Sequence, residues 1–322
     1  MPALKLLVLA DPSAPYLRLL EQLPDDVHIV VGDRKERFLE IAPAADAVLC
    51  GIGQGGLLRE LWPLFKNLKW VHSFSAGVES VLFQELVTSA VPLTNARGVF
   101  ARSLGEYAIA ACLFFAKDFR RMVRSQAEGK WDSYDVEELT GKVLGVIGYG
   151  EIGRAAAIRA KAMAMKVYAV RRRPELAEVD PLVDRVYSVP QRGDLMAESD
   201  YVLVASPLTP TTKGLVGERE LRRMKPTGVI MNLGRGPVID EAALVKVLEE
   251  KRIRGAALDV FDVEPLPEGH PFYRLENVLL SAHCADHTPG WVEESMQFFI
   301  DNFMRFYRSE PLENVVDKVN GY

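Results

Sequence analysis

Three polar residues each follow an apolar run that is typical of a buried strand. Arg235 comes after GVIMNLG, Glu264 lies four residues past GAALDV, and His283 follows NVLLSA. Ligands of parallel α/β sheets bind outside the carboxyl ends of the strands, so these three residues are candidates for one site. Taken singly, each is more often a structural histidine or a surface charge. Together, at one edge of one sheet, they favour function.

These residue types suit the reduction of a carbonyl group. The guanidinium of Arg235 can hold both a carboxylate oxygen and the keto oxygen of a 2-oxo acid, which polarises the bond to be reduced. The imidazole of His283 can donate a proton in reduction and accept it in oxidation. Glu264 would orient that ring through its other nitrogen and favour the imidazolium form. A nicotinamide coenzyme can supply the hydride for such a reaction.

A dinucleotide-binding pattern lies upstream of these residues. Gly148, Gly150 and Gly153 form G-x-G-x-x-G between the apolar run Val143–Ile147 and an alanine-rich helix that ends near Met165. The first glycine permits a tight turn, the second lets a pyrophosphate approach the backbone, and the third lets the helix pack on the strand. We expect the phosphates to bind N–H groups at the start of that helix.

The residues after the next strand indicate which dinucleotide binds. An acidic residue about 20 positions beyond the motif would mark an NAD site, because it accepts hydrogen bonds from the ribose 2′-hydroxyl. This chain has Arg171, Arg172 and Arg173 there instead. Guanidinium groups suit a 2′-phosphate, so the sequence predicts a preference for NADP(H), with NAD(H) also accepted. The alternative interpretation is a solvated basic turn.

A second stretch matches the same glycine pattern. Gly51, Gly53 and Gly56 follow the apolar run Ala47–Cys50, but neither an acidic residue nor an arginine cluster lies where the ribose would be. We interpret this stretch as a loop near the active cleft, and a plain flexible turn is an equally good interpretation.

Composition narrows the classes of function. The chain has 322 residues, a formal charge of −5 and 48% apolar residues, so it is long enough for two domains and has no basic stripe for nucleic acid. Its three cysteines have no disulfide or metal-ligand spacing, and we expect no metal site. No apolar run reaches the length of a membrane span, and the N-terminus does not resemble a signal peptide, so we expect a cytoplasmic protein.

Strands and helices alternate along the chain, which predicts an α/β protein with parallel sheets. The first half has five expected strands, which are Leu4–Leu9, Val27–Val31, Ala47–Cys50, Lys69–Ser73 and Val91–Thr94. The second half has six, which are Val143–Ile147, Val167–Val170, Tyr201–Ala205, Val229–Leu233, Ala256–Val260 and Val278–Ser281. One long helix, Ala101–Arg124, is expected to connect the halves, and an amphipathic helix, Trp291–Arg308, follows the last strand.

Six motifs, in this order, resemble the D-isomer-specific 2-hydroxyacid dehydrogenase family. They are HSFSAGVES, VIGYGEIGR, SPLTPTTKGLVG, MNLGRGPVIDEAAL, ALDVFDVEPLP and LLSAHCADHTP. The resemblance covers nearly the whole chain from about residue 45. It implies two doubly wound parallel-sheet domains: a Rossmann nucleotide-binding domain over residues 98–288 and a flavodoxin-like substrate domain formed by residues 1–97 plus 289–322.

The resemblance also implies roles for individual residues. Arg235, Glu264 and His283 fall on the family's catalytic set, and backbone amides near Ala76 and Gly77 would bind the substrate carboxylate. Asp259 would contact the nicotinamide carboxamide, and Ser206 and Pro207 would line the adenosine side. The full set of expected cofactor-binding residues is Gly148, Gly150, Glu151, Ile152, Gly153, Arg171, Arg172, Ser206, Pro207, Leu233, Asp259 and Ala285.

Three further expectations follow from the resemblance. Closure of a cleft between the domains would bring Gly77 to Arg235 and exclude water. A homodimer is expected through residues 106–139, with Trp131 at the interface. Side chains of Gln54, Phe74 and Trp291 are candidates to shape the substrate pocket.

The chain departs from the family pattern at two places. Asp286 stands where the family often has glycine, and His287 then offers a second imidazole beside the first. Arg171 replaces the usual acid, which resembles NADP-using glyoxylate and hydroxypyruvate reductases. The predicted activity is thus NADPH-dependent reduction of small 2-oxo acids to D-2-hydroxy acids. A formate dehydrogenase of the same fold fits less well, because that branch pairs its histidine with glutamine where this chain has Glu264. The alternative from another functional class is a dinucleotide-sensing regulatory protein of the same fold.

Overall fold

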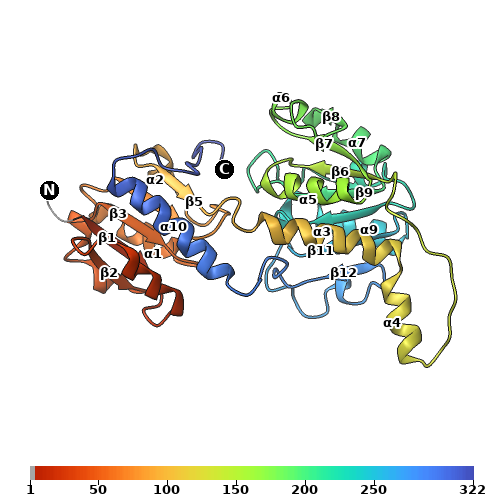
Figure 1. The fold of residues 1–322 in the computed structure, drawn as a ribbon, viewed down its shortest axis with the longest axis horizontal. Helices are drawn as coiled ribbons and strands as arrows, with labels where there is room; N and C mark the ends of the chain where they lie inside the picture. Colours follow the sequence, from red (N-terminus) through yellow and green to blue (C-terminus); the bar gives the residue numbers. More distant parts are fainter. Residues whose placement is uncertain (1–3) are drawn as a thin grey trace. The chain divides into compact units, whose positions relative to one another are not determined.

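The structure, a computed structural model, describes residues 4–322. The chain divides into two compact units, which we call unit 1 and unit 2 (Figure 1). Unit 1 holds the described residues up to Phe100 together with Thr288–Tyr322, and unit 2 holds Ala101–His287. The C-terminal segment therefore folds with the N-terminal part of the chain.

Within the described residues, unit 1 is built on a sheet of five parallel strands in the order β2-β1-β3-β4-β5. This is the flavodoxin-like strand order, and it confirms the predicted fold class for this unit. The strands are β1 (Lys5–Leu9), β2 (His28–Gly32), β3 (Ala47–Cys50), β4 (Trp70–Ser73) and β5 (Leu93–Asn95). The α-helices are α1 (Gly55–Leu61), α2 (Gln84–Thr88) and α10 (Trp291–Tyr307). Short 3₁₀ helices span Pro15–Gln22, Lys35–Phe38, Ala42–Ala44 and Trp62–Leu64.

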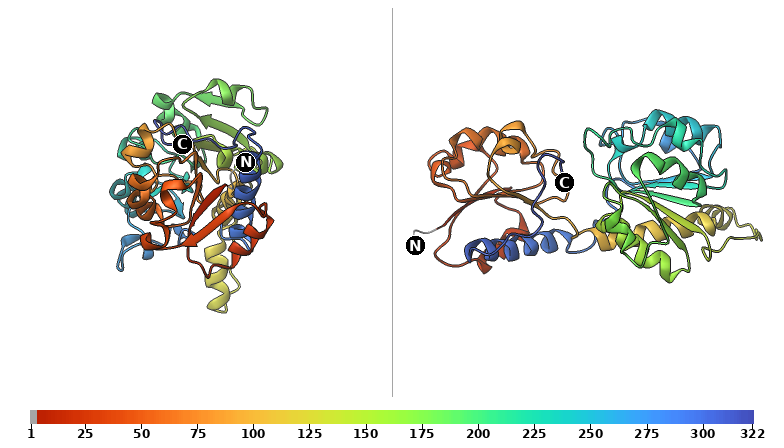
Figure 2. Two further views of the ribbon diagram at one scale, coloured as in Figure 1. Left: turned by 90° about the vertical axis from the view of Figure 1, so that its left-hand side faces the viewer. Right: turned by 90° about the horizontal axis from the view of Figure 1, so that it is seen from above.

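Alternate side chains of β1 enter two different cores. Leu7 and Leu9 pack with Leu58 of α1 and Leu86 of α2 on one face of the sheet. Leu6 and Val8 pack on the other face with side chains of α10. Figure 2 shows α10, in blue, on the opposite side of this sheet from the orange helices. Because a strand buried on both faces is apolar almost throughout, β1 and β3 appear in the sequence as continuous apolar runs.

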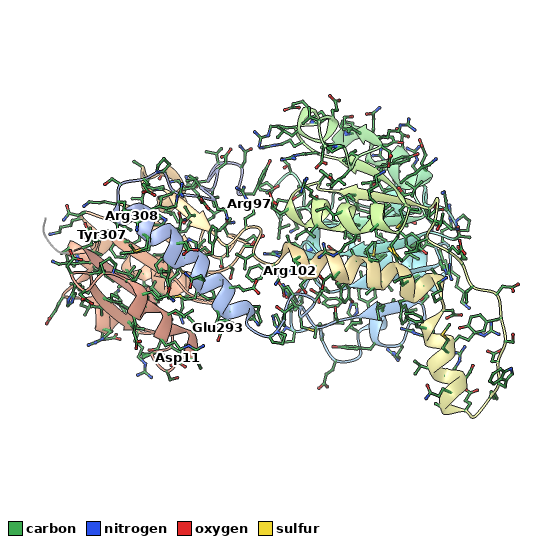
Figure 3. All side chains as sticks on the ribbon, viewed as in Figure 1. Asp11, Arg97, Arg102, Glu293, Tyr307 and Arg308 are labelled. Atoms are coloured by element: carbon green, nitrogen blue, oxygen red, sulfur yellow. The ribbon has the colours of Figure 1, made fainter. Side chains whose placement is uncertain are left out.

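Helix α10 is fixed to unit 1 by aromatic side chains and by a hydrogen bond near its last turn. Trp70 of β4 is fully buried and stacks on Phe299, with ring centroids 5.6 Å apart. Figure 3 labels Glu293 near the first turn of α10 and Tyr307 near its last turn. The hydroxyl of Tyr307 donates to Asp26 at 3.0 Å. Burial of each large side chain stabilises the unit by about 1.5–3 kcal/mol.

Within the described residues, unit 2 is built on a sheet of seven parallel strands in the order β12-β11-β10-β9-β6-β7-β8. The strands are β6 (Val143–Ile147), β7 (Lys166–Val170), β8 (Arg185–Tyr187), β9 (Tyr201–Val204), β10 (Val229–Asn232), β11 (Gly255–Leu258) and β12 (Val278–Leu280). Six of these were predicted, and the expected number of strands was wrong by one. The additional strand, β8, has three residues, begins with an exposed arginine and pairs with β7 alone, so it lacks a long apolar run.

Helices cover both faces of the unit 2 sheet, as the doubly wound fold requires. The helices are α3 (Ala101–Ala116), α4 (Phe119–Ala127), α5 (Glu151–Ala162), α6 (Glu175–Glu178), α7 (Arg192–Glu198), α8 (Glu218–Leu221) and α9 (Glu241–Glu249). Short 3₁₀ helices span Val189–Gln191, Gly236–Val238 and Pro271–Tyr273. Helices α3 and α5 pack on each other, whereas side chains of α7, α8 and α9 share a core with Val202, Ile230 and Leu258 of the sheet.

The segment predicted as one helix, Ala101–Arg124, is two helices. α3 ends at Ala116 and α4 begins at Phe119, because Asp118 has a left-handed backbone with φ +50°. The Asp118 carboxylate accepts a hydrogen bond from the Arg121 N–H and so caps the second helix. The prediction failed because neither proline nor glycine marks the break, and aspartate is one of the few other residues that tolerate this conformation.

Every helix among residues 4–322 is too short or too polar to cross a membrane. The same part of the chain holds no cluster of three or more histidine, cysteine or acidic side chains arranged to bind a metal ion.

Candidate active site

The three predicted catalytic residues follow three neighbouring strands of unit 2. β10, β11 and β12 pair in parallel register, so their carboxyl ends lie at one edge of the sheet. Arg235 lies three residues past β10, Glu264 six residues past β11, and His283 three residues past β12. The fold thus brings the loops that carry them to the same edge.

His283 and Glu264 are in direct contact. Nδ1 of the imidazole lies 2.6 Å from Oε2 of the carboxylate, and the other oxygen, Oε1, accepts the Phe261 N–H at 2.9 Å. Because a carboxylate only accepts, Nδ1 carries the proton and donates it, which leaves Nε2 for another partner. The His283 side chain is 45% exposed, so a ligand can reach it.

The buried carboxylate of Asp259 organises the loop that carries His283. Its Oδ1 accepts three hydrogen bonds, from the Ser281 hydroxyl at 2.6 Å and from the N–H groups of Cys284 and Ala285 at 2.9 and 3.1 Å. The backbone oxygen of Asp259 accepts the His283 N–H at 2.9 Å. His283 itself has φ +50°, a conformation that a non-glycine residue keeps only where the surroundings hold it.

The Ser281 hydroxyl extends this network to helix α3, where it lies 3.0 Å from the hydroxyl of Tyr107. A hydroxyl has one hydrogen, and the closer, charged acceptor Asp259 takes the one on Ser281. Tyr107 therefore donates to Ser281. Sequence reasoning missed this contact, since no spacing rule relates a helix residue to a strand end 174 positions away.

The loop that carries Arg235 is fixed by its neighbour Asn232. The Asn232 side chain accepts the Gly234 N–H at 3.1 Å and donates to the backbone oxygen of Arg235 at 3.0 Å. The guanidinium Nη1 donates to the Gly234 oxygen at 2.8 Å. Gly236 packs so closely on Phe261 that a Cβ would lie 2.0 Å from the Phe261 carbonyl carbon. The loop that carries Arg235 therefore contacts the segment that leads to Glu264.

The glycine turn at residues 148–153 has the space that a dinucleotide needs. Gly148 has φ +92°, and a Cβ there would lie 2.7 Å from the Ser206 backbone nitrogen. A Cβ on Gly150 would meet no atom within 4 Å, whereas one on Gly153 would lie 2.8 Å from Val146. The open side at Gly150, at the start of α5, is where phosphates bind in this arrangement. The residues present therefore fit a dinucleotide.

Other predicted coenzyme residues border the same turn. Ser206 follows β9, and its hydroxyl donates to the Ile147 oxygen at the end of β6. The Thr212 hydroxyl donates to the carbonyl oxygen of the next residue, Pro207, at 2.6 Å. β6 and β9 are the strands between which the chain reverses its direction of winding, and α/β sheets bind ligands at such points. Leu233 is 3% exposed, so its side chain belongs mainly to the core.

The arginine cluster follows β7 directly. Burial raises the pKa of the Tyr149 hydroxyl, and the charge of Arg171 is among the groups that oppose this rise. The backbone oxygen of Val170, the residue before Arg171, accepts the Tyr149 N–H at 3.2 Å, so the arginine cluster begins beside the middle residue of the glycine turn. Glu151 and Ile152 occupy the first two positions of α5.

The second imidazole has a different environment. His287 Nε2 lies 3.8 Å from Asp286, and burial raises the pKa of that carboxyl group. The corresponding distance between His283 and Glu264 is 2.6 Å, which is 1.2 Å shorter than the 3.8 Å between His287 and Asp286. The ring of His283 is oriented by its short contact with Glu264.

The predicted substrate residues of unit 1 lie past the end of β4. The Ala76 oxygen accepts a hydrogen bond from the Asn95 side chain at 2.5 Å, which holds the segment that includes Gly77. Phe74 is 1% exposed and packs against Tyr16, so the expectation that its side chain shapes the pocket is wrong. Trp291 packs edge-on against Phe100, with centroids 5.9 Å apart.

The second glycine pattern also lies in unit 1, between β3 and α1. The helix that it leads into, α1, has seven residues, whereas α5 has twelve. A Cβ on Gly55 would lie 2.2 Å from the Ser80 oxygen, so this turn is closed by the chain itself at that point.

Comparison with known proteins identifies the family. Residues 109–285 match the sequence model of "D-isomer specific 2-hydroxyacid dehydrogenase, NAD binding domain", a range that includes the turn at Gly148 and not that at Gly51. The chain is 33% identical over 318 residues to a glyoxylate reductase of Thermofilum pendens, covering 94% of this chain and 91% of that protein. It is 33% identical over 271 residues to a glyoxylate reductase of Korarchaeum cryptofilum, covering 80% and 79%.

A solved structure agrees with this assignment. The D-isomer specific 2-hydroxyacid dehydrogenase of Xanthobacter autotrophicus Py2, in complex with NADPH and MES, superposes with a TM-score of 0.84 at 26% identity, covering 99% of this chain and 100% of that one. Its likeness extends over both units, and the matched sequence model covers most of unit 2. The chain therefore belongs to the D-isomer-specific 2-hydroxyacid dehydrogenase family and is an NAD(P)-dependent oxidoreductase.

Proposed function

We propose that the protein reduces small 2-oxo acids of the glyoxylate and hydroxypyruvate type to D-2-hydroxy acids, with NADPH as the preferred coenzyme. The observation that carries this proposal is the contact between His283 and Glu264 at the strand edge that also bears Arg235. Small 2-oxo acids are supported as the substrate class by the relatives of the chain, two of which are glyoxylate reductases.

In this proposal His283 is the proton donor. Glu264 holds Nδ1, so Nε2 is directed to the substrate and gives its proton to the carbonyl oxygen as that oxygen becomes a hydroxyl. The dinucleotide, when bound, supplies the hydride to the carbonyl carbon. Arg235 binds the carboxylate and the keto oxygen, and it stabilises the negative charge that develops on that oxygen. In the reverse direction His283 accepts the proton.

The remaining substrate contacts come from unit 1. We assign the carboxylate of the substrate to the backbone amides of Ala76 and Gly77, in addition to Arg235. In our assignment unit 1 is the substrate domain and unit 2 the coenzyme domain. The hydrogen bond from Asn95 to Ala76 supports this, since a fixed backbone presents its N–H groups at little entropic cost.

The choice of NADPH rests on the charge around the adenosine. Arg171, Arg172 and Arg173 follow β7 with no acidic residue among them, and the relative from Xanthobacter autotrophicus was solved with NADPH. Three guanidinium groups favour a 2′-phosphate over a 2′-hydroxyl.

We further propose a homodimer formed through residues 106–139. Trp131 is fully exposed in the isolated chain, and Val123 and Val136 are 67% and 46% exposed. Several large apolar side chains exposed within one segment are typical of an interface. Light scattering of the purified protein should give twice the chain mass, and a monomer that persists at high concentration would contradict the proposal.

Steady-state kinetics test the activity. Glyoxylate, hydroxypyruvate and pyruvate are each assayed with NADPH and with NADH, and the product of hydroxypyruvate is tested for the D configuration. We expect turnover of at least one acid, a higher kcat/KM with NADPH, and D-glycerate as the product. The absence of turnover, or a clear preference for NADH, would contradict the proposal.

A further inference from the structure

The segment that carries the three arginines is attached at its start to the glycine turn. The backbone oxygen of Val170, the last residue of β7, accepts hydrogen bonds from the N–H groups of Gly148 and Tyr149, at 3.0 and 3.2 Å. Arg171 follows immediately. We call residues 171–179 the arginine loop.

The arginine loop is attached at its end to the same turn, through the side chain of Asp180. One carboxylate oxygen of Asp180 accepts the Tyr149 hydroxyl at 3.1 Å and the Arg154 Nε–H at 2.9 Å. Tyr149 is the middle residue of G-Y-G, and Arg154 lies in the first turn of α5. The other oxygen accepts the Leu182 N–H at 3.1 Å. Both ends of the loop are thus bound to the elements that would hold the pyrophosphate.

Asp180 is an ionised group in a nearly closed environment. Its side chain is 9% exposed. Burial alone would raise the pKa of this carboxyl group, but the N–H of Leu182, the hydroxyl of Tyr149 and the guanidinium of Arg154 outweigh burial and hold the pKa below its usual range. Hydrogen bonds to an ionised acceptor are about twice as strong as neutral ones. Asp180 therefore fixes the loop firmly.

We propose that Asp180 is a positioning residue that determines the preference for NADPH over NADH. This rests on the proposed use of NADPH. In NADPH the 2′-phosphate and the pyrophosphate are attached to one ribose, so a protein that binds both must keep its two phosphate sites at a fixed separation. The contacts of Asp180 join the arginine loop, which would bind the 2′-phosphate, to Tyr149 and Arg154 beside the pyrophosphate site. NADH has no 2′-phosphate and does not depend on that separation.

Two variants of the full-length protein test the proposal. Asp180→Asn keeps the size of the side chain and removes its charge, and Tyr149→Phe removes a single hydroxyl. NADPH and NADH binding are measured by coenzyme fluorescence, and adenosine 2′,5′-bisphosphate and AMP binding by calorimetry. We expect affinity for NADPH and for the bisphosphate to fall about tenfold in each variant. Asp180→Asn removes the charge that strengthens the hydrogen bonds from Tyr149 and Arg154, and Tyr149→Phe removes one of these hydrogen bonds. Affinity for NADH and AMP should stay within about twofold of the original protein.

Asp184 provides the matched control. Its carboxylate accepts from Lys161, at the far end of α5, and from the Val167 N–H, so it also joins α5 to the segment after the arginine loop. The pKa of Asp184 is likewise lowered, although burial raises it, because Lys161 and the Val167 N–H stabilise the carboxylate. Asp184→Asn should leave the ratio of NADPH to NADH affinity unchanged.

The outcomes separate this inference from the proposed function. If the unaltered protein binds NADH more tightly than NADPH, the proposed coenzyme is wrong, and this inference fails with it. If the unaltered protein prefers NADPH but both variants keep that preference, or lose both coenzymes equally, only the role of Asp180 is overturned. Thermal unfolding of each variant shows whether it is folded. If Asp180→Asn does not fold, Tyr149→Phe gives the result, because it changes the interior least.

Discussion

The imidazole Nδ1 of His283 lies 2.6 Å from the carboxylate Oε2 of Glu264, although 19 positions separate the two residues. The contact exists because β11 and β12 are parallel neighbours whose loops leave the sheet at the same edge. It fixes which nitrogen of His283 carries the proton in the resting pair, and it makes the other nitrogen the one that meets a substrate.

Replacement of Glu264 by glutamine should lower kcat. The amide oxygen can still accept from Nδ1, but it no longer stabilises the imidazolium form by charge. We expect a loss of about 10- to 100-fold in kcat for hydroxypyruvate, with little change in the KM for NADPH. A variant whose kcat stays within about twofold of the original would show that the carboxylate charge is not used.

Replacement of Gly150 by alanine should separate coenzyme binding from stability. An added methyl group meets no atom of the chain within 4 Å, so thermal unfolding without coenzyme should change little. The methyl group would lie where the pyrophosphate approaches, so NADPH affinity should fall at least about tenfold. Gly153→Ala is the matched control, since its methyl group would contact Val146 at 2.8 Å and destabilise the unit by about 1–3 kcal/mol. Unchanged NADPH affinity in Gly150→Ala would place the phosphates elsewhere.

Replacement of Ser281 by alanine should destabilise unit 2. The buried carboxylate of Asp259 would lose its hydrogen bond from the Ser281 hydroxyl, and the Tyr107 hydroxyl would lose its acceptor. We expect the free energy of unfolding to fall by about 1.5–3 kcal/mol, as for other hydrogen bonds to charged groups. Ser281→Thr keeps the hydroxyl and should recover most of the loss. Equal stability of the alanine and threonine variants would show that the hydroxyl contributes nothing.

Acid should weaken unit 1 through His72. This side chain is fully buried, and burial lowers its pKa to about 3, while an unfolded histidine titrates near 6.5. Between these two values the unfolded chain binds the extra proton, so stability falls as the pH decreases below about 6.5. From pH 7 to pH 5 the contribution is a loss of about 2 kcal/mol. His72→Phe should remove that part of the pH dependence. Unfolding is measured by tryptophan fluorescence, to which Trp70, with its ring 5.9 Å from that of His72, contributes. An unchanged pH dependence would contradict this account.

The sequence was sufficient for the elements that depend on local patterns. Most of the buried strands appear as apolar runs, and Gly148, Gly150 and Gly153 could be recognised because the steric demands of the turn are local. Parallel strands place successive loops at one edge, so Arg235, Glu264 and His283 could be assigned to that edge without coordinates.

The sequence was insufficient to predict features that depend on contacts between residues far apart along the chain. The break at Asp118 depends on a left-handed backbone that has no obligatory residue type, and β8 is held by pairing with β7 rather than by its own apolar character. The hydrogen bonds of Tyr107 with Ser281, and of Tyr149 with Asp180, join residues far apart along the chain. Such contacts are set by packing, which spacing does not describe. Phe74 shows the same limit, because its place in the core follows from Tyr16 and not from its motif.

The choice between the two imidazoles tests the central claim most directly. His283→Asn and His287→Asn are compared in single-turnover reduction of hydroxypyruvate, with NADPH binding measured on the same samples. The account predicts that His283→Asn lowers the rate by about 100-fold or more while NADPH still binds, because a general acid contributes that much, and that His287→Asn retains most of the rate. A His283→Asn protein that turns over near the original rate, or a larger loss in His287→Asn, would contradict the account.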